Sequence, residues 1–108
     1  MRTAIAAILA AVSIALAGAG TAHADPTDDL YFQLLRDAGI DVSGDPWDAV
    51  GYAKGSICPD LRSGSKTAEQ LAANLSADEM RVDPSFTYGK SFAYIRAAQR
   101  AYCPDTLR

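Results

Sequence analysis

The sequence predicts an all-α fold, a small bundle of about four helices tied by one disulfide. After residue 25, apolar side chains recur at helical spacing, and no window alternates apolar with polar residues as a half-buried strand would. The chain also carries two cysteines, each followed by Pro-Asp. Three Asp-Pro pairs indicate helix starts, because Asp is a preferred N-cap and Pro a preferred first helical residue: Asp25-Pro26, Asp45-Pro46 and Asp83-Pro84.

Residues 1–24 are typical of a secretory signal peptide. Arg2 precedes an apolar run over residues 4–17, and the segment 22–24 forms an A-x-A cleavage site. The run is short for a membrane anchor, which needs about 20 residues. We therefore predict cleavage between Ala24 and Asp25, a single helical domain over residues 25–108 without a transmembrane segment, and a secreted or cell-envelope location.

Cys58 and Cys103 are the only cysteines, and in an exported chain we expect them to pair, because the compartment beyond the membrane is oxidising. The bridge would close a loop with 44 residues between its ends. Such a loop is worth about 4 kcal/mol on the chain-entropy model, a large part of the stability of a domain with so thin a core. A haem-ligand role for Cys-Pro is disfavoured because it needs a free thiolate.

The first two helices follow from their caps and apolar faces. A helix over residues 26–37 places Tyr31, Leu34, Leu35 and Ala38 on one face and ends at Gly39. A second helix over 46–57 has an inner stripe of Trp47, Val50, Ala53 and Ile57. Pro59 is expected to end this helix at Cys58, with a kinked continuation as the alternative.

Two more helices are predicted towards the C-terminus. Thr67 and Gln70 form a capping box for a helix over 68–75, and a separate turn is expected over 76–80. The last helix is predicted to begin at Pro84 or Thr87 and to end at Tyr102, before Cys103-Pro104. Its inner side would carry Tyr88, Phe92, Ile95 and Tyr102, interrupted by Gln99.

Little catalytic chemistry is expected. The only histidine, His23, lies in the leader, so the remaining chain has no imidazole for acid–base work or metal binding. We predict no catalytic, cofactor-binding or metal-ligating residues. Three groups of carboxylates could act as acid–base pairs or bind calcium, but caps and solvated helix starts are favoured for them: Asp28/Asp29, Asp78/Glu79 and Asp41/Asp45/Asp48.

Charge and aromatic content narrow the choice of partner. The whole chain has a formal net charge of −3, and loss of Arg2 makes the remainder one unit more negative. This disfavours nucleic acid as a partner. Lys90, Arg96 and Arg100 give the last helix a basic edge, best explained as a solvated face. Four aromatic side chains could line a ligand groove, although packing is favoured for most: Trp47, Tyr52, Tyr88 and Tyr94.

The chain resembles the domain of unknown function 732, a family of small exported actinobacterial proteins, chiefly mycobacterial. The resemblance rests on ordered motifs over nearly the whole chain after the leader: Asp29-x-Tyr31-Phe32-x-x-Leu35, Gly39-Ile40, Gly55-Ser56-Ile57-Cys58 with Leu61 and Gly64, and Phe92 to Ala98 followed by Tyr102-Cys103-Pro104. Pro59 departs from the usual pattern. The resemblance implies an all-helical, disulfide-tied exported domain with no agreed activity, so no catalytic residues transfer.

We therefore expect a non-enzymatic binding or interaction domain at the cell envelope or outside the cell, with an unidentified protein or envelope component as partner. The alternative is a carrier of a lipid or small apolar ligand held between helices. A small carboxylate-dependent hydrolase is disfavoured by the missing histidine.

Overall fold

The computed structural model of the chain describes residues 25–107, and the predicted signal peptide, Ala24 included, lies outside the described residues, as does Arg108. The described residues form four helical rods and no strand, which confirms the predicted all-α class. The elements are α2 (Pro26–Asp37), α3 (Pro46–Tyr52) continuing through the π-helical turn η2 (Ala53–Ile57) into α4 (Cys58–Ser63), α5 (Ala68–Glu79), α6 (Tyr88–Tyr102) and the 3₁₀ turn η3 (Pro104–Thr106).

Helix α2 has the predicted bounds. The Asp25 carboxylate accepts a hydrogen bond from the Asp28 backbone N–H at 2.9 Å, so the start is capped as expected. At the other end Gly39 adopts φ 75°, a left-handed conformation open to glycine. The Ile40 N–H can then reach back to the Leu35 carbonyl at 2.9 Å, and the buried Ile40 side chain closes the turn.

The predicted end of the second helix at Cys58 is wrong. The backbone stays helical through residues 53–57, where the turn widens and the Cys58 N–H bonds to the Ala53 carbonyl. Pro59 then lies in the first turn of α4, the part of a helix that tolerates proline best, directly after this widened turn. The helix ends instead at Gly64, which has φ 77°. Cys58 therefore lies inside a continuous rod.

Helix α5 begins at the predicted capping box. The Thr67 N–H bonds to Gln70 Oε1 at 2.8 Å, and the Gln70 N–H bonds to Thr67 Oγ1 at 3.1 Å. The separate turn expected over 76–80 is wrong, because the helix runs unbroken to Glu79. Ser76 is buried within the helix and does not cap a new one.

Helix α6 begins at Tyr88 with Thr87 as its N-cap, the later of the two predicted starts. Asp83-Pro84 does not begin a helix. The Asp83 carboxylate instead accepts hydrogen bonds from the Ser85 N–H at 3.0 Å and the Ser85 hydroxyl at 2.6 Å, which closes a local turn.

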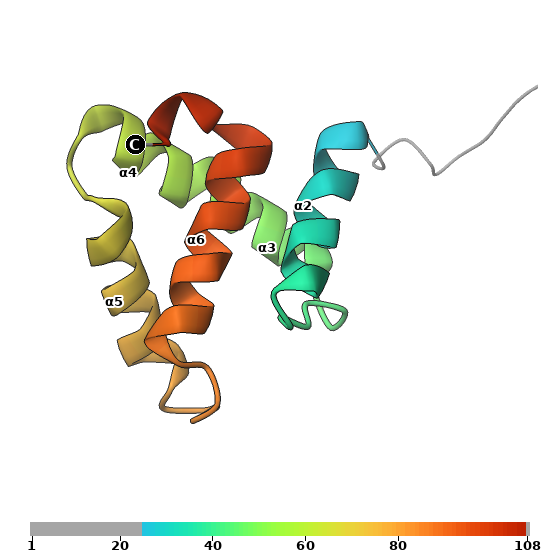
Figure 1. The fold of residues 1–108 in the computed structure, drawn as a ribbon, viewed down its shortest axis with the longest axis vertical. Helices are drawn as coiled ribbons and strands as arrows, with labels where there is room; N and C mark the ends of the chain where they lie inside the picture. Colours follow the sequence, from blue (N-terminus) through green and yellow to red (C-terminus); the bar gives the residue numbers. More distant parts are fainter. Residues whose placement is uncertain (1–24, 108) are drawn as a thin grey trace, which may run out of the picture.

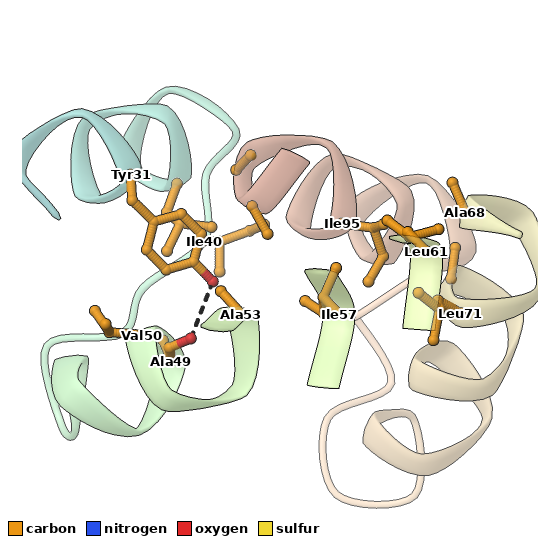
Figure 2. Packing of buried hydrophobic residues seen from close by; sticks show 14 residues of the cluster. Tyr31, Ile40, Ala49, Val50, Ala53, Ile57, Leu61, Ala68, Leu71 and Ile95 are labelled. Atoms are coloured by element: carbon orange, nitrogen blue, oxygen red, sulfur yellow. Dashed lines mark hydrogen bonds between the residues drawn. The ribbon is translucent and has the colours of Figure 1, made fainter. Parts of the chain in front are cut away.

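Helix α6 is the central rod of the molecule, with α2 on one side and α5 on the other (Figure 1). Figure 2 shows the buried residues between these rods. At one end Tyr31 reaches from α2 to α3 and donates a hydrogen bond to the Ala49 carbonyl at 3.3 Å. At the other end Ile95 of α6 meets Ile57 and residues of α4 and α5. One core therefore runs through the whole described chain.

Two aromatic side chains predicted to face this core do not. Trp47 is 43% exposed and Tyr88 is 45% exposed. Both lie in the first turn of a helix, and each makes a ring contact with a partly buried phenylalanine: Trp47 with Phe32 at 5.5 Å and Tyr88 with Phe92 at 6.1 Å between centroids.

The Cys58 and Cys103 sulfur atoms are 2.02 Å apart and form the disulfide, which joins the start of α4 to the end of α6. Both residues are buried. Gln99, expected to interrupt the apolar side of α6, is also buried, and its Nε2 donates to the Thr106 carbonyl and hydroxyl at 3.1 Å each. These bonds fix η3 against the disulfide-tied end of the bundle.

Candidate functional site

A groove of about 590 Å³ opens where the loop before α3, α3 itself, the end of α5 and the first half of α6 meet. Its apolar and aromatic lining consists of Ile40, Val42, Trp47, Ala49, Tyr52, Leu75, Phe86 and Tyr94. The rest of its lining consists of Gly51 and the five carboxylates Asp41, Asp45, Asp48, Asp78 and Glu79. We call this hollow the acidic groove.

Aromatic rings form the floor of the acidic groove. The Tyr94 ring lies 6.2 Å from the Tyr52 ring and 6.4 Å from the Phe86 ring, measured between centroids. On its inner side Tyr94 makes an edge contact with the buried Tyr31 ring at 6.4 Å. The floor is therefore anchored to the core, while Trp47 stands on the rim. The sequence favoured packing for most of these aromatics, and Tyr52 and Tyr94 both pack and face the groove.

The carboxylates come from both walls of the groove. Asp45 caps α3 by accepting a hydrogen bond from the Asp48 N–H at 3.1 Å, as predicted. Asp41 is not a cap; its carboxylate accepts a hydrogen bond from the Ser43 N–H at 2.9 Å in the loop before α3. Within residues 25–107, no Lys or Arg side chain forms an ion pair with Asp48, Asp78 or Glu79. No basic residue of the described chain lines the acidic groove either.

Burial and the negative charge of the acidic groove both affect the pKa of the two tyrosines in its floor, Tyr52 and Tyr94. Burial raises the pKa of Tyr52, and the charges of Asp78, Asp60 and Glu79 raise it further. Burial also raises the pKa of Tyr94. Both phenols therefore stay protonated near neutral pH and offer hydrogen-bond donors inside a negative field.

A second hollow of about 480 Å³ adjoins the acidic groove and shares Ile40, Asp41 and Val42 with it. Phe32 and Pro46 supply most of its remaining apolar lining, and Arg36 also lines it. The loop over residues 40–42 is thus the common wall of two neighbouring hollows, one acidic and one mainly apolar.

A separate cluster surrounds Asp28, a buried carboxylate at the start of α2. Tyr102 donates a hydrogen bond to it, and Lys54 Nζ lies 3.9 Å from the same oxygen and 5.2 Å from the centroid of the Tyr102 ring. The three side chains satisfy one another and join α2, η2 and α6, so we assign them a structural role. Asp29, paired with Asp28 in the sequence as a possible acid–base pair, is exposed.

The described residues contain no group of three or more His, Cys, Asp or Glu side chains arranged to hold a metal ion. Between residues 25 and 107, none of the helices combines the length and the apolar character that a membrane crossing requires.

The model of a family of proteins of unknown function, DUF732, matches residues 27–105. This range contains both cysteines and every residue that lines the acidic groove. Comparisons with curated proteins and with solved structures give no significant match.

Proposed function

The chain belongs to the DUF732 family of proteins of unknown function, and we propose that it is an exported, non-enzymatic binding domain that acts at the cell envelope or outside the cell. Its binding site is the acidic groove, and its partner is a protein or another envelope component. Export is supported by the predicted signal peptide and by a buried disulfide, which forms most readily in an oxidising compartment.

The observation that carries this proposal is the combination of an open aromatic floor with carboxylates that no Lys or Arg side chain between residues 25 and 107 neutralises. The volume of the acidic groove falls within the range of about 300–1,000 Å³ usual for ligand sites. The exposed apolar side chains Met80 and Val82, the latter 81% exposed, lie in the turn that follows Glu79.

The residue types favour binding over catalysis. Residues 25–108 contain no histidine, and both cysteine sulfur atoms are held in the disulfide, so neither an imidazole base nor a thiol nucleophile is at hand. Two of the groove carboxylates are already committed to a turn and a helix cap. A carboxylate-dependent hydrolase therefore has little support.

The carrier of a lipid or small apolar ligand remains the second candidate, favoured by the aromatic lining of the groove. An acyl chain placed there would desolvate carboxylates on both walls without giving them a partner, which is unfavourable. This is the reason for ranking a binding domain first.

The test compares two exposed aromatic residues. Purified wild-type protein, Trp47→Ser and Tyr88→Ser are immobilised and exposed to solubilised envelope material from the source cells. The two side chains are almost equally exposed, but only Trp47 lines the acidic groove. We expect Trp47→Ser to lose the material that wild type and Tyr88→Ser retain. Equal retention by all three proteins would contradict the proposal, and copurified lipid seen by native mass spectrometry would favour the carrier.

A further inference from the structure

We infer, on the basis of the proposed function, that the acidic groove binds a basic peptide segment of a partner protein. A lysine or arginine side chain of that segment lies along the Tyr52 and Tyr94 rings, and its charge is placed between the carboxylates of the two walls. An apolar residue next to it in the peptide occupies the adjoining hollow.

Within the described residues, some acidic side chains are paired with basic ones outside the acidic groove, but none is within it. Elsewhere in the described chain, three acidic side chains have a basic neighbour within ion-pair distance: Asp28 with Lys54, Asp105 with Arg62 and Asp60 with Lys66. The acidic groove gathers carboxylates from two walls and no cation from the described residues. Like charges facing one hollow repel each other, and an external cation would relieve that repulsion.

The protein itself shows how such a cation is held. Lys54 lies over the Tyr102 ring, 5.2 Å from its centroid, with its ammonium 3.9 Å from the Asp28 carboxylate. A tyrosine face and a carboxylate thus flank a lysine side chain within this fold. The acidic groove repeats the combination without the lysine: its floor has two tyrosine rings, and Asp78 and Glu79 lie close enough to Tyr52 to raise the pKa of its phenol, after the larger effect of burial.

The side-chain chemistry of lysine and arginine suits this lining better than that of a small inorganic cation. Their aliphatic stems cover apolar surface while the charged end stays with polar groups. The aromatic floor between the carboxylates offers such a surface. A bare metal ion would leave these rings uncovered, and the described residues hold no metal-ligand cluster.

The adjoining hollow favours a peptide over an isolated amine. It shares the wall formed by Ile40, Asp41 and Val42 with the acidic groove, and its further lining is mainly apolar. Successive residues of an extended chain lie about 3.3 Å apart, so one short segment can place a basic side chain in the first hollow and an apolar one in the second. The binding motif is therefore a basic residue close to an apolar residue.

Trp47 offers a reporter, because it is the single tryptophan of the chain and stands on the rim of the groove. Purified protein with its disulfide intact is titrated with the capped peptide Ala-Lys-Leu-Lys-Ala, and with matched peptides carrying Gln or Glu in place of Lys. Binding is followed by tryptophan emission and, independently, by isothermal titration. We expect saturable binding of the lysine peptide alone, weakening as salt rises from about 50 to about 200 mM.

Two double variants localise the effect. Asp78→Asn with Glu79→Gln should weaken binding of the lysine peptide about threefold to tenfold, because two ion pairs at a partly exposed site are lost. The control, Asp37→Asn with Glu69→Gln, removes the same charge from outside the acidic groove and should leave affinity within about twofold of wild type.

The outcomes separate the ligand chemistry from the binding role. If the glutamine peptide binds as well as the lysine peptide, if no peptide binds, or if both double variants weaken binding equally, the basic-peptide inference is wrong. The binding domain would still stand if Trp47→Ser loses envelope material that Tyr88→Ser retains. Concentration-dependent dimerisation abolished by the Asp78/Glu79 variant would make a second copy of this chain the occupant, and would also overturn the inference.

Discussion

Tyr102, in the last turn of α6, donates a hydrogen bond from its hydroxyl to the carboxylate of Asp28, in the first turn of α2. The bond links residues 74 positions apart and so joins the two ends of the described chain. Asp28 is 4% exposed, and the Tyr102 ring also packs against Tyr31 at 5.2 Å between centroids. A buried acid is thus satisfied by residues far from it in the sequence.

Tyr102→Phe should lower the free energy of unfolding by about 1–3 kcal/mol, because the buried carboxylate loses its donor while the ring packing is kept. Urea unfolding followed by circular dichroism measures this. Tyr88→Phe is the control, since Tyr88 is an exposed tyrosine of the same helix. Equal unfolding midpoints for the two variants would contradict the assigned structural role of the Asp28 cluster.

Stability should fall at alkaline pH. Burial raises the pKa of Tyr31, Tyr94 and Tyr102 above the usual value of 10.0, and the charge of Asp28 adds to the effect at Tyr102. Since these phenols lose their protons more readily in the unfolded chain, their contribution is fully present below about pH 10 and is lost as pH rises above it. Urea midpoints across this range, with tyrosinate absorbance, test the prediction. A midpoint that stays constant while all five tyrosines ionise together would contradict it.

The helix starts show which parts of the fold the sequence could predict. Asp25, Asp45 and Thr67 cap helices as expected, because an N-cap bond joins residues three positions apart and needs no tertiary partner. Asp83 does not cap a helix as predicted, because its carboxylate accepts hydrogen bonds from the nearby Ser85 instead. The continuation beyond Cys58 was the alternative and not the prediction, because a π turn leaves no marked pattern in the sequence.

The sequence could predict single residues of the acidic groove but not the groove as a whole. The sequence singled out Trp47, Tyr52 and Tyr94 as possible groove residues, and it noted the carboxylates as separate groups. Nothing local places the end of α5 beside the loop before α3, and Phe86 and Leu75 carried no sign of a site. Their meeting depends on how α5 and α6 pack, and pairwise helix packing is not encoded at any single position.

Replacing both cysteines, Cys58→Ser with Cys103→Ser, should lower the free energy of unfolding by about 4 kcal/mol while any folded fraction remains helical. The bond spans 45 positions, so its loss frees a large loop in the unfolded chain. Chemical unfolding and far-ultraviolet circular dichroism measure both quantities. An unchanged midpoint would show that helix packing alone holds the end of α6 against α4.

Ser91→Ala should raise the free energy of unfolding by about 1 kcal/mol. The Ser91 hydroxyl is fully buried in α6 and has no hydrogen-bond partner among the described residues. Ser76→Ala is the matched control, because the buried hydroxyl of Ser76 bonds to the Met80 sulfur at 3.3 Å. A loss of stability in Ser91→Ala would mean that the hydroxyl turns to bond a backbone carbonyl of its own helix.

The helix that begins at Pro46 continues through Pro59 and does not end there. The π turn over Ala53–Ile57 precedes Pro59. The buried Ala53, at the start of this turn, and the buried Ile57 and Cys58, at its end, fix the rotation of the helix across it. Pro59→Ala restores a backbone hydrogen-bond donor, which stabilises the helix, but it also raises the conformational entropy of the unfolded chain. These two effects on the free energy of unfolding oppose each other. The free energy of unfolding should therefore change by less than about 1 kcal/mol.

The reduction potential of the disulfide should also change little in Pro59→Ala. The reason is that the packing of α4 against the end of α6, and not the proline ring, positions the two sulfur atoms. Equilibration of wild type and Pro59→Ala against a series of glutathione buffers gives the two reduction potentials, which should nearly coincide. Pro46→Ala, in the first turn of α3, controls for the general effect of losing a proline. A marked shift in the reduction potential for Pro59→Ala alone would show that the proline ring itself sets the orientation of Cys58. The helix would then turn the Cys58 sulfur away from Cys103 once the ring is removed.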